Sequence, residues 1–215
     1  MLITCWSPKG GSGVTVVTAA LALLACGPDG GGPPGAVVAL DAAGPGRGDL
    51  AGALGIAAGP TAAGPGGAAG GTRRGAAGTG IEVGSAGPLV VRTWPEGSPL
   101  GPLLAAGELV VADAGPGLGA DADLLTAAAH CLAVIRPCYL GVRRLVASEG
   151  RIDGIVVVEE PDRALGVDDI EHVTGHPVVA RVRWDASVAR AVDAGLLPSR
   201  LPRALRALQG ALPCR

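Results

Sequence analysis

Short runs of consecutive apolar residues alternate with helix-forming stretches along most of the chain. An uninterrupted apolar run is typical of a strand that is buried on both faces, as in a parallel sheet covered by helices. The expected strands are 2–6, 36–40, 89–92, 109–112, 131–135, 154–158 and 178–182. The expected helices are 14–26, 49–54, 121–129, 139–147, 167–173, 186–194 and 201–212. The alternation predicts a three-layer α/β fold, in which helices flank both faces of a mostly parallel central sheet.

The length of 215 residues and the 48% hydrophobic content predict a single domain, spanning residues 1–215, with a sizeable core. One segment departs from this composition. Residues 57–80 are almost entirely Ala, Gly, Pro and Thr, broken by Arg73 and Arg74. Such a segment has few side chains to bury, so we expect a flexible insertion within the domain.

Lys9 is the one lysine in a chain that contains sixteen arginines. Phe is absent, and Met and Tyr each occur once. A GC-rich genome depletes residues with AT-rich codons, so most of these absences reflect mutational drift. The position of a lysine that remains under this pressure is therefore informative.

Charge and cysteine content exclude several classes of protein. The net charge of −2 argues against non-specific DNA binding, which needs a concentrated basic face. The five cysteines are scattered without a C-x-x-C pair, so we expect reduced thiols rather than zinc or disulfides. The apolar stretch 14–26 is shorter than the about 20 residues that span a bilayer, and no signal peptide is recognisable. These observations predict a cytoplasmic protein.

A glycine loop lies between the first expected strand and the first expected helix. Its residues Gly10, Gly11, Ser12 and Gly13 stand at the carboxyl end of a strand, where open α/β sheets bind ligands. Backbone N–H groups of such a loop, with the N-terminus of the following helix, bind phosphate. The hydroxyl of Thr15, directly after the loop, is where Mg²⁺ is normally held.

The loop fails the strict pattern G-x-x-x-x-G-K-[ST] at two positions, where Pro8 and Val14 stand. On the loop alone, a plain glycine-rich turn is an open alternative. Asp41 and Asp113 each end an apolar strand, which is where phosphate-loop proteins hold the water shell of Mg²⁺. The three features together, in this order, favour a phosphate and magnesium site.

Residues 8–15, Pro-Lys-Gly-Gly-Ser-Gly-Val-Thr, resemble the deviant Walker A motif x-K-G-G-x-G-K-[ST] of the MinD/ParA family of P-loop ATPases. Asp41-Ala42-Ala43 is similar to the D-x-D switch I of that family, and residues 113–117 to its D-x-P-P-G segment. Its late P-x-D…A…G stretch is similar to Arg183-Trp184-Asp185…Ala191…Gly195. The resemblance covers most of the chain outside the Ala/Gly insertion.

The resemblance implies ATP or ADP with Mg²⁺ as cofactors and a nucleotide-dependent homodimer. Lys9 falls on the family's signature lysine, which acts across the dimer, and Asp41 on the residue that senses the γ-phosphate. Thr15 and Asp113 would hold Mg²⁺. The remaining expected nucleotide contacts are Gly10, Gly11, Ser12, Gly13, Val14, Trp184 and Asp185.

The implied biology is spatial positioning or assembly, in cell division at the septum or in chromosome partition. Gly48-Asp49-Leu50 resembles the G-D-[LV] of the CpaE/TadZ branch, which implies placement of Tad-type pilus machinery. A protein partner is expected but unidentified. Recruitment to a pole, the septum or the inner membrane surface is left open.

Departures from the family pattern bear on catalysis. Val14 removes a cation that faces the phosphates, and Ala43 replaces the second switch I aspartate. Glu159 and Glu160 stand where relatives carry an Asn-Arg adenine contact. Losing one charged hydrogen-bond partner costs about 1.5–3 kcal/mol, roughly tenfold to over a hundredfold in affinity or rate. We therefore expect weak or absent hydrolysis and at most a weak ATPase.

Two other functions are kept as alternatives. One is a scaffold that has lost nucleotide altogether. The other is an ATP-dependent ligase of the dethiobiotin synthetase or CobQ type, which shares the fold but needs a working phosphate lysine.

Two features of the C-terminal part carry alternatives of their own. Leu201, Leu205, Leu208 and Leu212 recur at helical spacing. That stripe is typical of a membrane-binding amphipathic helix, but docking on the sheet is favoured. Trp184 could stack on adenine, with core packing favoured.

Overall fold

The computed structural model describes the chain except for residues 28–36, 45–48, 57–80, 96, 118–121 and 214–215. The insertion expected at 57–80 therefore lies outside the described residues. The extent of the domain, 1–215, stays a prediction.

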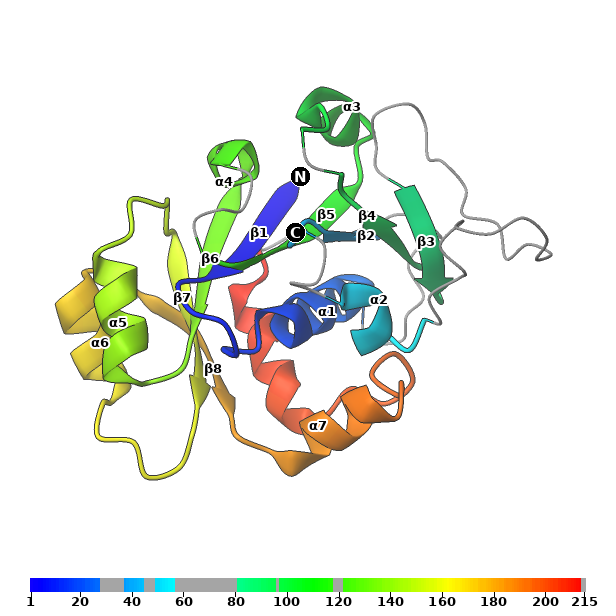
Figure 1. Ribbon diagram of the computed structural model, residues 1–215. Helices are drawn as coiled ribbons and strands as arrows, with labels where there is room; N and C mark the ends of the chain where they lie inside the picture. The colour runs from blue at the N-terminus through cyan, green and yellow to red at the C-terminus, as the bar shows by residue number, and fades with distance from the viewer. Residues whose placement is uncertain (28–36, 45–48, 57–80, 96, 118–121, 214–215) are drawn as a thin grey trace.

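The described strands form an eight-stranded sheet with the order β3-β4-β2-β5-β1-β6-β7-β8 (Figure 1). Neighbouring strands are parallel except for the antiparallel pair β3 and β4. The strands are β1 (Leu2–Ser7), β2 (Val37–Asp41), β3 (Ile81–Ala86), β4 (Leu89–Thr93), β5 (Leu109–Pro116), β6 (His130–Ile135), β7 (Gly154–Glu159) and β8 (Val178–Arg183). The predicted mostly parallel α/β sheet is confirmed.

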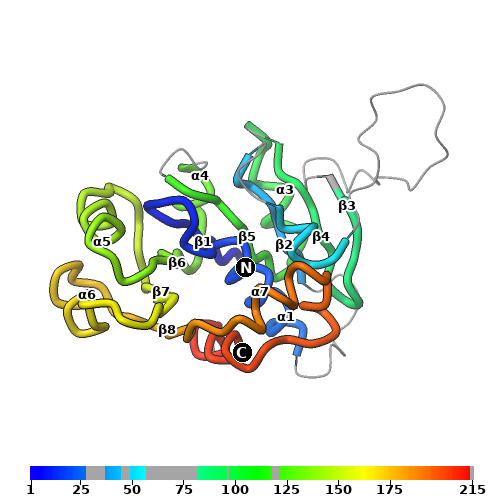
Figure 2. The backbone as a smooth tube through the Cα atoms, turned by 60° about the horizontal axis from the view of Figure 1, so that its bottom comes forward, coloured from blue at the N-terminus to red at the C-terminus, as the bar shows by residue number. Residues whose placement is uncertain are grey.

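Helices cover both faces of this sheet, as three layers require. The helices are α1 (Val14–Ala25), α2 (Leu50–Ala53), α3 (Leu100–Ala105), α4 (Ala122–Ala127), α5 (Tyr139–Val146), α6 (Val167–Thr174), α7 (Ala186–Asp193) and a 3₁₀ helix, η1 (Arg203–Ala211). One buried cluster packs α1, α2, α7 and η1 on one face of the sheet. Two other clusters pack the helices α3, α4, α5 and α6 on its opposite face. Figures 1 and 2 show α5 and α6 together, away from α1 and α7.

Helix α1 lies over the middle of the sheet. Val17, Ala19, Leu21 and Ala22 are each at most 1% exposed, although they point in different directions around the helix. A helix that is apolar around its whole circumference needs cover on all sides. The sheet, α2 and η1 supply that cover.

Strand β3 and helix α3 were not predicted. Residues 81–86 contain Glu82, Gly84 and Ser85, so they lack the apolar run that marks a buried strand. A Cβ on Gly84 would lie 2.5 Å from Cγ2 of Ile56, so β3 packs too closely there for a side chain. β3 pairs with the adjoining β4 across the two-residue turn 87–88, whereas its contact with Ile56 is distant in sequence.

The last expected helix, 201–212, is a 3₁₀ helix over Arg203–Ala211 rather than an α-helix. Residues three apart lie on the same side of a 3₁₀ helix. Leu205 and Leu208 are three apart and are 1% and 0% exposed, packed in the cluster that contains α1. Docking on the sheet, the favoured interpretation of these leucines, is thus what the structure contains.

No helix among the described residues is both long enough and apolar enough to cross a bilayer.

Candidate functional site

The glycine loop connects the end of β1 to the start of α1 at the carboxyl edge of the parallel strands (Figure 1). Gly11 and Gly13 have φ angles of 78° and 87°, a left-handed conformation that glycine adopts without strain. The hydroxyls of Ser7 and Ser12 donate to the carbonyl of Lys9 over 2.7 and 2.8 Å. A Cβ on Gly11 would meet nothing within 4 Å, so the outer side of the loop is open to a ligand.

Val14 is the first residue of α1, and its side chain is 7% exposed within the core. The position that carries the phosphate lysine in the strict pattern therefore holds an apolar side chain. Lys9 is partly exposed on the loop, and its side chain makes no ion pair with a described residue. The charge of Lys9 is consequently free for an external anion.

Asp41 is the last residue of β2. Asp113 lies within β5, which continues to Pro116 instead of ending at 112 as expected, and the parallel register pairs the two residues directly. The carboxylate of Asp41 accepts from the backbone N–H groups of Ala43 and Leu50 at 3.3 and 3.2 Å. Burial raises the pKa of Asp41, while these two N–H groups act in the opposite direction. The two carboxylates thus repel each other unless a cation or a proton stands between them.

Asp113 is fully buried. Its Oδ1 accepts from the N–H of Gly115 at 2.8 Å, whereas its Oδ2 has no hydrogen-bond partner among the described residues. Burial, together with a smaller contribution from the nearby charge of Asp41, raises the pKa of Asp113 to about 6. The hydroxyl of Thr15 lies beside this carboxylate and lowers its pKa, although it makes no hydrogen bond to Oδ2.

These residues fit a magnesium ion. A buried carboxylate oxygen without a partner is costly, and a cation would satisfy it. Mg²⁺ prefers oxygen ligands and keeps several waters, so one or two carboxylates and a hydroxyl suffice. Asp113, Asp41 and Thr15 offer such a set. No group of three or more metal-ligating His, Cys, Asp or Glu residues occurs in the described part of the chain.

Trp184 and Asp185, the expected contacts beyond the phosphates, follow β8 at the same edge. Trp184 is 55% exposed, so the favoured expectation that it packs in the core is wrong. The guanidinium of Arg136 lies 5.9 Å from the centre of the Trp184 ring. The carboxylate of Asp185 caps α7 by accepting from the N–H of Ser187 at 2.7 Å, and this bond lowers the pKa of Asp185.

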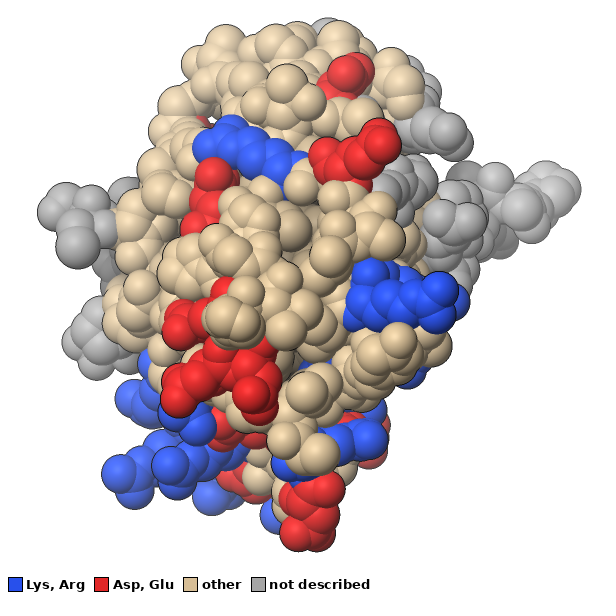
Figure 3. Space-filling view, turned by 90° about the vertical axis from the view of Figure 1, so that its left-hand side faces the viewer, with Lys and Arg blue, Asp and Glu red and all other residues tan. Residues whose placement is uncertain are grey.

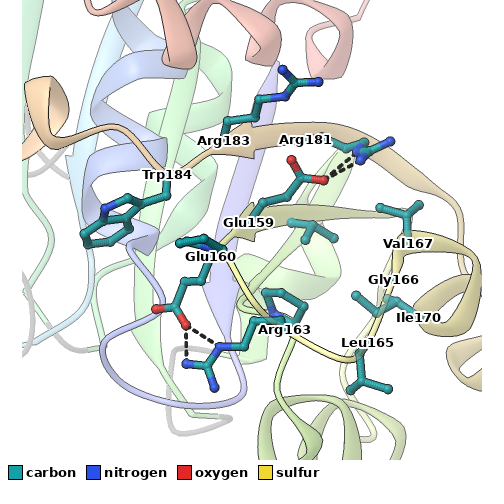
Figure 4. A pocket seen from close by; sticks show the side chains of 13 residues that line it. Glu159, Glu160, Arg163, Leu165, Gly166, Val167, Ile170, Arg181, Arg183 and Trp184 are labelled. Carbon is teal, nitrogen blue, oxygen red and sulfur yellow. Dashed lines mark hydrogen bonds and ion pairs between the residues drawn. The ribbon is translucent and has the colours of Figure 1, made fainter.

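A cavity of about 390 Å³ lies between the carboxyl ends of β7 and β8 and the start of α6 (Figure 4). Beside it, a second hollow of about 320 Å³ is lined by Glu160, Pro161, Asp162, Arg163 and Trp184. Charged side chains of both signs gather toward this end of the face that α5 and α6 cover (Figure 3).

Glu160 is the centre of an ion-pair cluster in this hollow. Its Oε1 accepts from Nη1 of Arg136 at 2.7 Å, and its Oε2 accepts from Nε of Arg163 at 2.7 Å. The hydrogen bond from Arg163 and the charge of Arg136 hold the pKa of Glu160 below its usual range. Figure 4 shows the Glu160 side chain between Arg163 and Trp184.

The fold brings the loop and this hollow close together. A Cβ on Gly13 would lie 3.9 Å from Cγ2 of Val158, which stands two residues before Glu160. Arg136 and Arg163 were missed in the sequence. Arg136 directly follows β6, and Asp41 likewise ends β2, so a charged residue at the end of a strand was the available signal for Arg136.

No protein-family model matches the sequence, and no curated protein matches it. Solved structures do match. MinD, a cell division ATPase from Pyrococcus furiosus, is 18% identical with a TM-score of 0.70, over 97% of this chain and 95% of that one. A ParA family ATPase from Chlorobium tepidum is 17% identical with a TM-score of 0.65, over 97% and 95%. McdA from Cyanothece, solved with ATP, is 16% identical with a TM-score of 0.68, over 98% and 94%.

The chain therefore has the fold of the MinD/ParA P-loop ATPases, as its motifs predicted. The likeness covers nearly the whole length of each protein.

Proposed function

We propose that the chain binds a purine nucleotide, ATP or ADP by its motifs, together with Mg²⁺ at the carboxyl edge of the sheet. The observation that carries the proposal is Oδ2 of Asp113, a fully buried carboxylate oxygen without a partner among the described residues. It lies beside Thr15, the second residue after the left-handed Gly13. A magnesium ion satisfies the oxygen, and phosphates complete the coordination of the ion.

In this proposal the loop residues Gly10, Gly11, Ser12 and Gly13 bind the phosphates through backbone N–H groups. Thr15 and Asp113 hold Mg²⁺ and its waters, and Asp41 responds to the γ-phosphate. When bound, the ion neutralises phosphate charge. Trp184 stacks on the base.

We propose a dimer in which Lys9 of each protomer contacts the nucleotide of the other. Lys9 is partly exposed, lies at the open loop and makes no ion pair with a described residue. A cation in that position binds an external phosphate more readily than one already paired. The motif resemblance supplies the expectation that the phosphate belongs to a second copy.

Hydrolysis in this proposal is weak or absent. Phosphoryl transfer depends on cations and on positioned water at the γ-phosphate. Val14 supplies no cation, because its side chain is apolar and buried. Ala43 supplies no carboxylate. Its Cβ lies so close to Gly115 that a Cβ on Gly115 would be 2.7 Å from it. The nucleotide then acts as a switch for association rather than as a rapidly consumed substrate.

A positioning or assembly role follows, in cell division, partition or pilus placement, with a protein partner still to be identified. The CpaE/TadZ interpretation rests on Gly48-Asp49-Leu50, of which Gly48 lies outside the described residues. Asp49 caps α2, accepting from the N–H of Gly52 at 2.7 Å, so this motif has a structural role in any case.

The rival proposals are a scaffold without nucleotide and a carboxylate-dependent ligase. The buried Val14 favours the scaffold over the ligase, because the ligase chemistry needs a phosphate lysine. Equilibrium dialysis with labelled ATP, in Mg²⁺ and in EDTA, tests the proposed function. Binding that requires Mg²⁺ and is lost in Asp113→Ala, but kept in the exposed control Asp193→Ala, supports it. Absence of binding of any purine nucleotide at millimolar concentration contradicts it.

A further inference from the structure

Resting on the proposed nucleotide site, we propose that its base end selects guanine over adenine and that Glu160 makes the selection. The phosphate contacts of a glycine loop are the same for every nucleoside triphosphate, so they leave the base open. The base is chosen by side chains at the far end of the nucleotide. In this chain those side chains are the cluster around Glu160.

The place of Glu160 suits a base contact. It directly follows β7, and Trp184 directly follows the neighbouring β8, so both stand at the edge that carries the glycine loop. Both line the same hollow of about 320 Å³. The contact between Gly13 and Val158 connects this hollow to the end of the loop.

The chemistry of Glu160 favours one purine. Its two arginine partners keep the carboxylate ionised, so both oxygens accept hydrogen bonds and neither donates. Guanine presents two adjacent donors, N1–H and the N2 amino group, which match two carboxylate oxygens. Adenine presents one amino group beside the lone pair of N1, which repels a carboxylate oxygen. Guanine therefore satisfies Glu160 more fully than adenine does.

The existing partners of Glu160 are compatible with this role. The Arg163 side chain is 45% exposed although that of Glu160 is 14% exposed, so Arg163 can turn toward solvent while Glu160 stays in place. Arg136 is held between Oε1 of Glu160 and the ring of Trp184, so it keeps the carboxylate oriented. If Arg163 is displaced, its guanidinium can donate to O6 and N7 of guanine, a pairing that arginine makes elsewhere.

Trp184 contributes affinity rather than selectivity. Every base has a π-face, so stacking on an aromatic ring is tolerant of base identity. Because Trp184 is 55% exposed while Trp6 and Trp94 are 0% and 5% exposed, its fluorescence reports on a base in the hollow. Stacking should quench this fluorescence with either purine.

The first test measures dissociation constants of the unaltered protein for GTP, ITP and ATP, by equilibrium dialysis and by Trp184 fluorescence. GTP is expected to bind at least tenfold more tightly than ATP. ITP keeps N1–H but lacks the N2 amino group, so it should fall between them. The series separates the contribution of N1–H from that of the N2 amino group without any mutation.

The second test changes the acceptor. Glu160→Gln turns one carboxylate oxygen into an amino donor, so GTP should lose at least tenfold in affinity. XTP has a carbonyl in place of the N2 amino group and should bind this variant more tightly than GTP does. The control Glu149→Gln removes the same charge from an exposed site and should leave the relative affinities for these nucleotides unchanged.

The outcomes separate this inference from the proposed function. If ATP binds as tightly as GTP or more tightly, the selection by Glu160 is wrong and the proposed nucleotide site stands. If no nucleotide binds at millimolar concentration, the proposed function falls and this inference with it. If Glu160 only stabilises the strand ends through its ion pairs, Glu160→Gln lowers the affinity for every nucleotide alike, and XTP binds the variant no more tightly than GTP does. That result overturns the inference. If that variant fails to fold, the GTP, ITP and ATP series decides.

Discussion

Asp41, the last residue of β2, and Asp113, in the neighbouring parallel strand β5, are register partners, and burial raises the pKa of both. Neither carboxylate forms an ion pair with a described residue. The pair is thus an electrostatic cost that the protein carries without a ligand. A cation that binds between them would remove that cost, which links stability to ligand binding.

The pH dependence of folding should reveal this cost. The pKa of Asp113 is raised from 3.8 to about 6, so the folded state holds this proton more tightly than the unfolded state. Its stabilising contribution is full below pH 4 and is lost as pH rises through 6, by roughly 3 kcal/mol at most. Urea unfolding of the ligand-free protein at pH 4 to 7.5 measures it.

The matched variant is Asp113→Asn, which cannot titrate. The difference in unfolding free energy between this variant and the unaltered protein should shift in favour of the variant as pH rises from 4 to 7.5. A difference that is independent of pH would show that Asp113 keeps an ordinary pKa.

Replacing Val14 with lysine should couple stability to nucleotide. Val14 is 7% exposed, so Val14→Lys buries an ammonium and should lower the free energy of unfolding by several kcal/mol. A bound phosphate would pair with that ammonium, and ATP with Mg²⁺ should recover much of the loss. Thermal unfolding with and without nucleotide measures both effects.

The control for Val14→Lys is Val17→Lys, on the same helix and 1% exposed. It should destabilise the protein without any such recovery. Equal recovery in the two variants would argue that Val14 does not face the phosphates.

Lys9→Ala tests the trans contact. Light scattering of the unaltered protein with nucleotide and Mg²⁺ should give the mass of a dimer, and Lys9→Ala should remain monomeric under the same conditions. Lys9 lies on the surface loop, so folding should be unchanged. If the two proteins have the same mass with and without nucleotide, Lys9 has no role in association.

The 3₁₀ helix η1 should contribute to folding through its leucines. Leu205 is 1% exposed, and removing such a side chain leaves a cavity, so Leu205→Ala should cost about 2–5 kcal/mol. Leu196→Ala is a matched control, because Leu196 is 48% exposed and should change stability by less than about 0.5 kcal/mol. Equal, small effects would indicate that η1 is not docked on the sheet.

Much of the sheet could be predicted because its strands are buried on both faces. That burial leaves continuous apolar runs, as in β1 and β5, which a sequence displays directly. Asp41 and Asp113 could be located as the polar residues that end such runs. Strand β3 could not, because its place depends on pairing with β4 and on the approach of Ile56 to Gly84.

The ion pairs of Glu160 were the part of the candidate site that the sequence could not predict. Glu160 pairs with Arg136, 24 residues away, and this distance carries no local pattern. Core packing was the favoured expectation for Trp184. It is instead exposed at the carboxyl edge of the sheet, directly after β8 and two residues before α7 begins.

Equilibrium dialysis distinguishes magnesium-dependent nucleotide binding from its absence. The protein is equilibrated with labelled ATP and, separately, labelled GTP, each with Mg²⁺ and with EDTA, beside Asp113→Ala. Nucleotide is expected to be retained only with Mg²⁺ and to be lost in the variant. If neither nucleotide is retained at millimolar concentration with Mg²⁺, the carboxyl edge of this sheet is not a nucleotide site and the account is wrong.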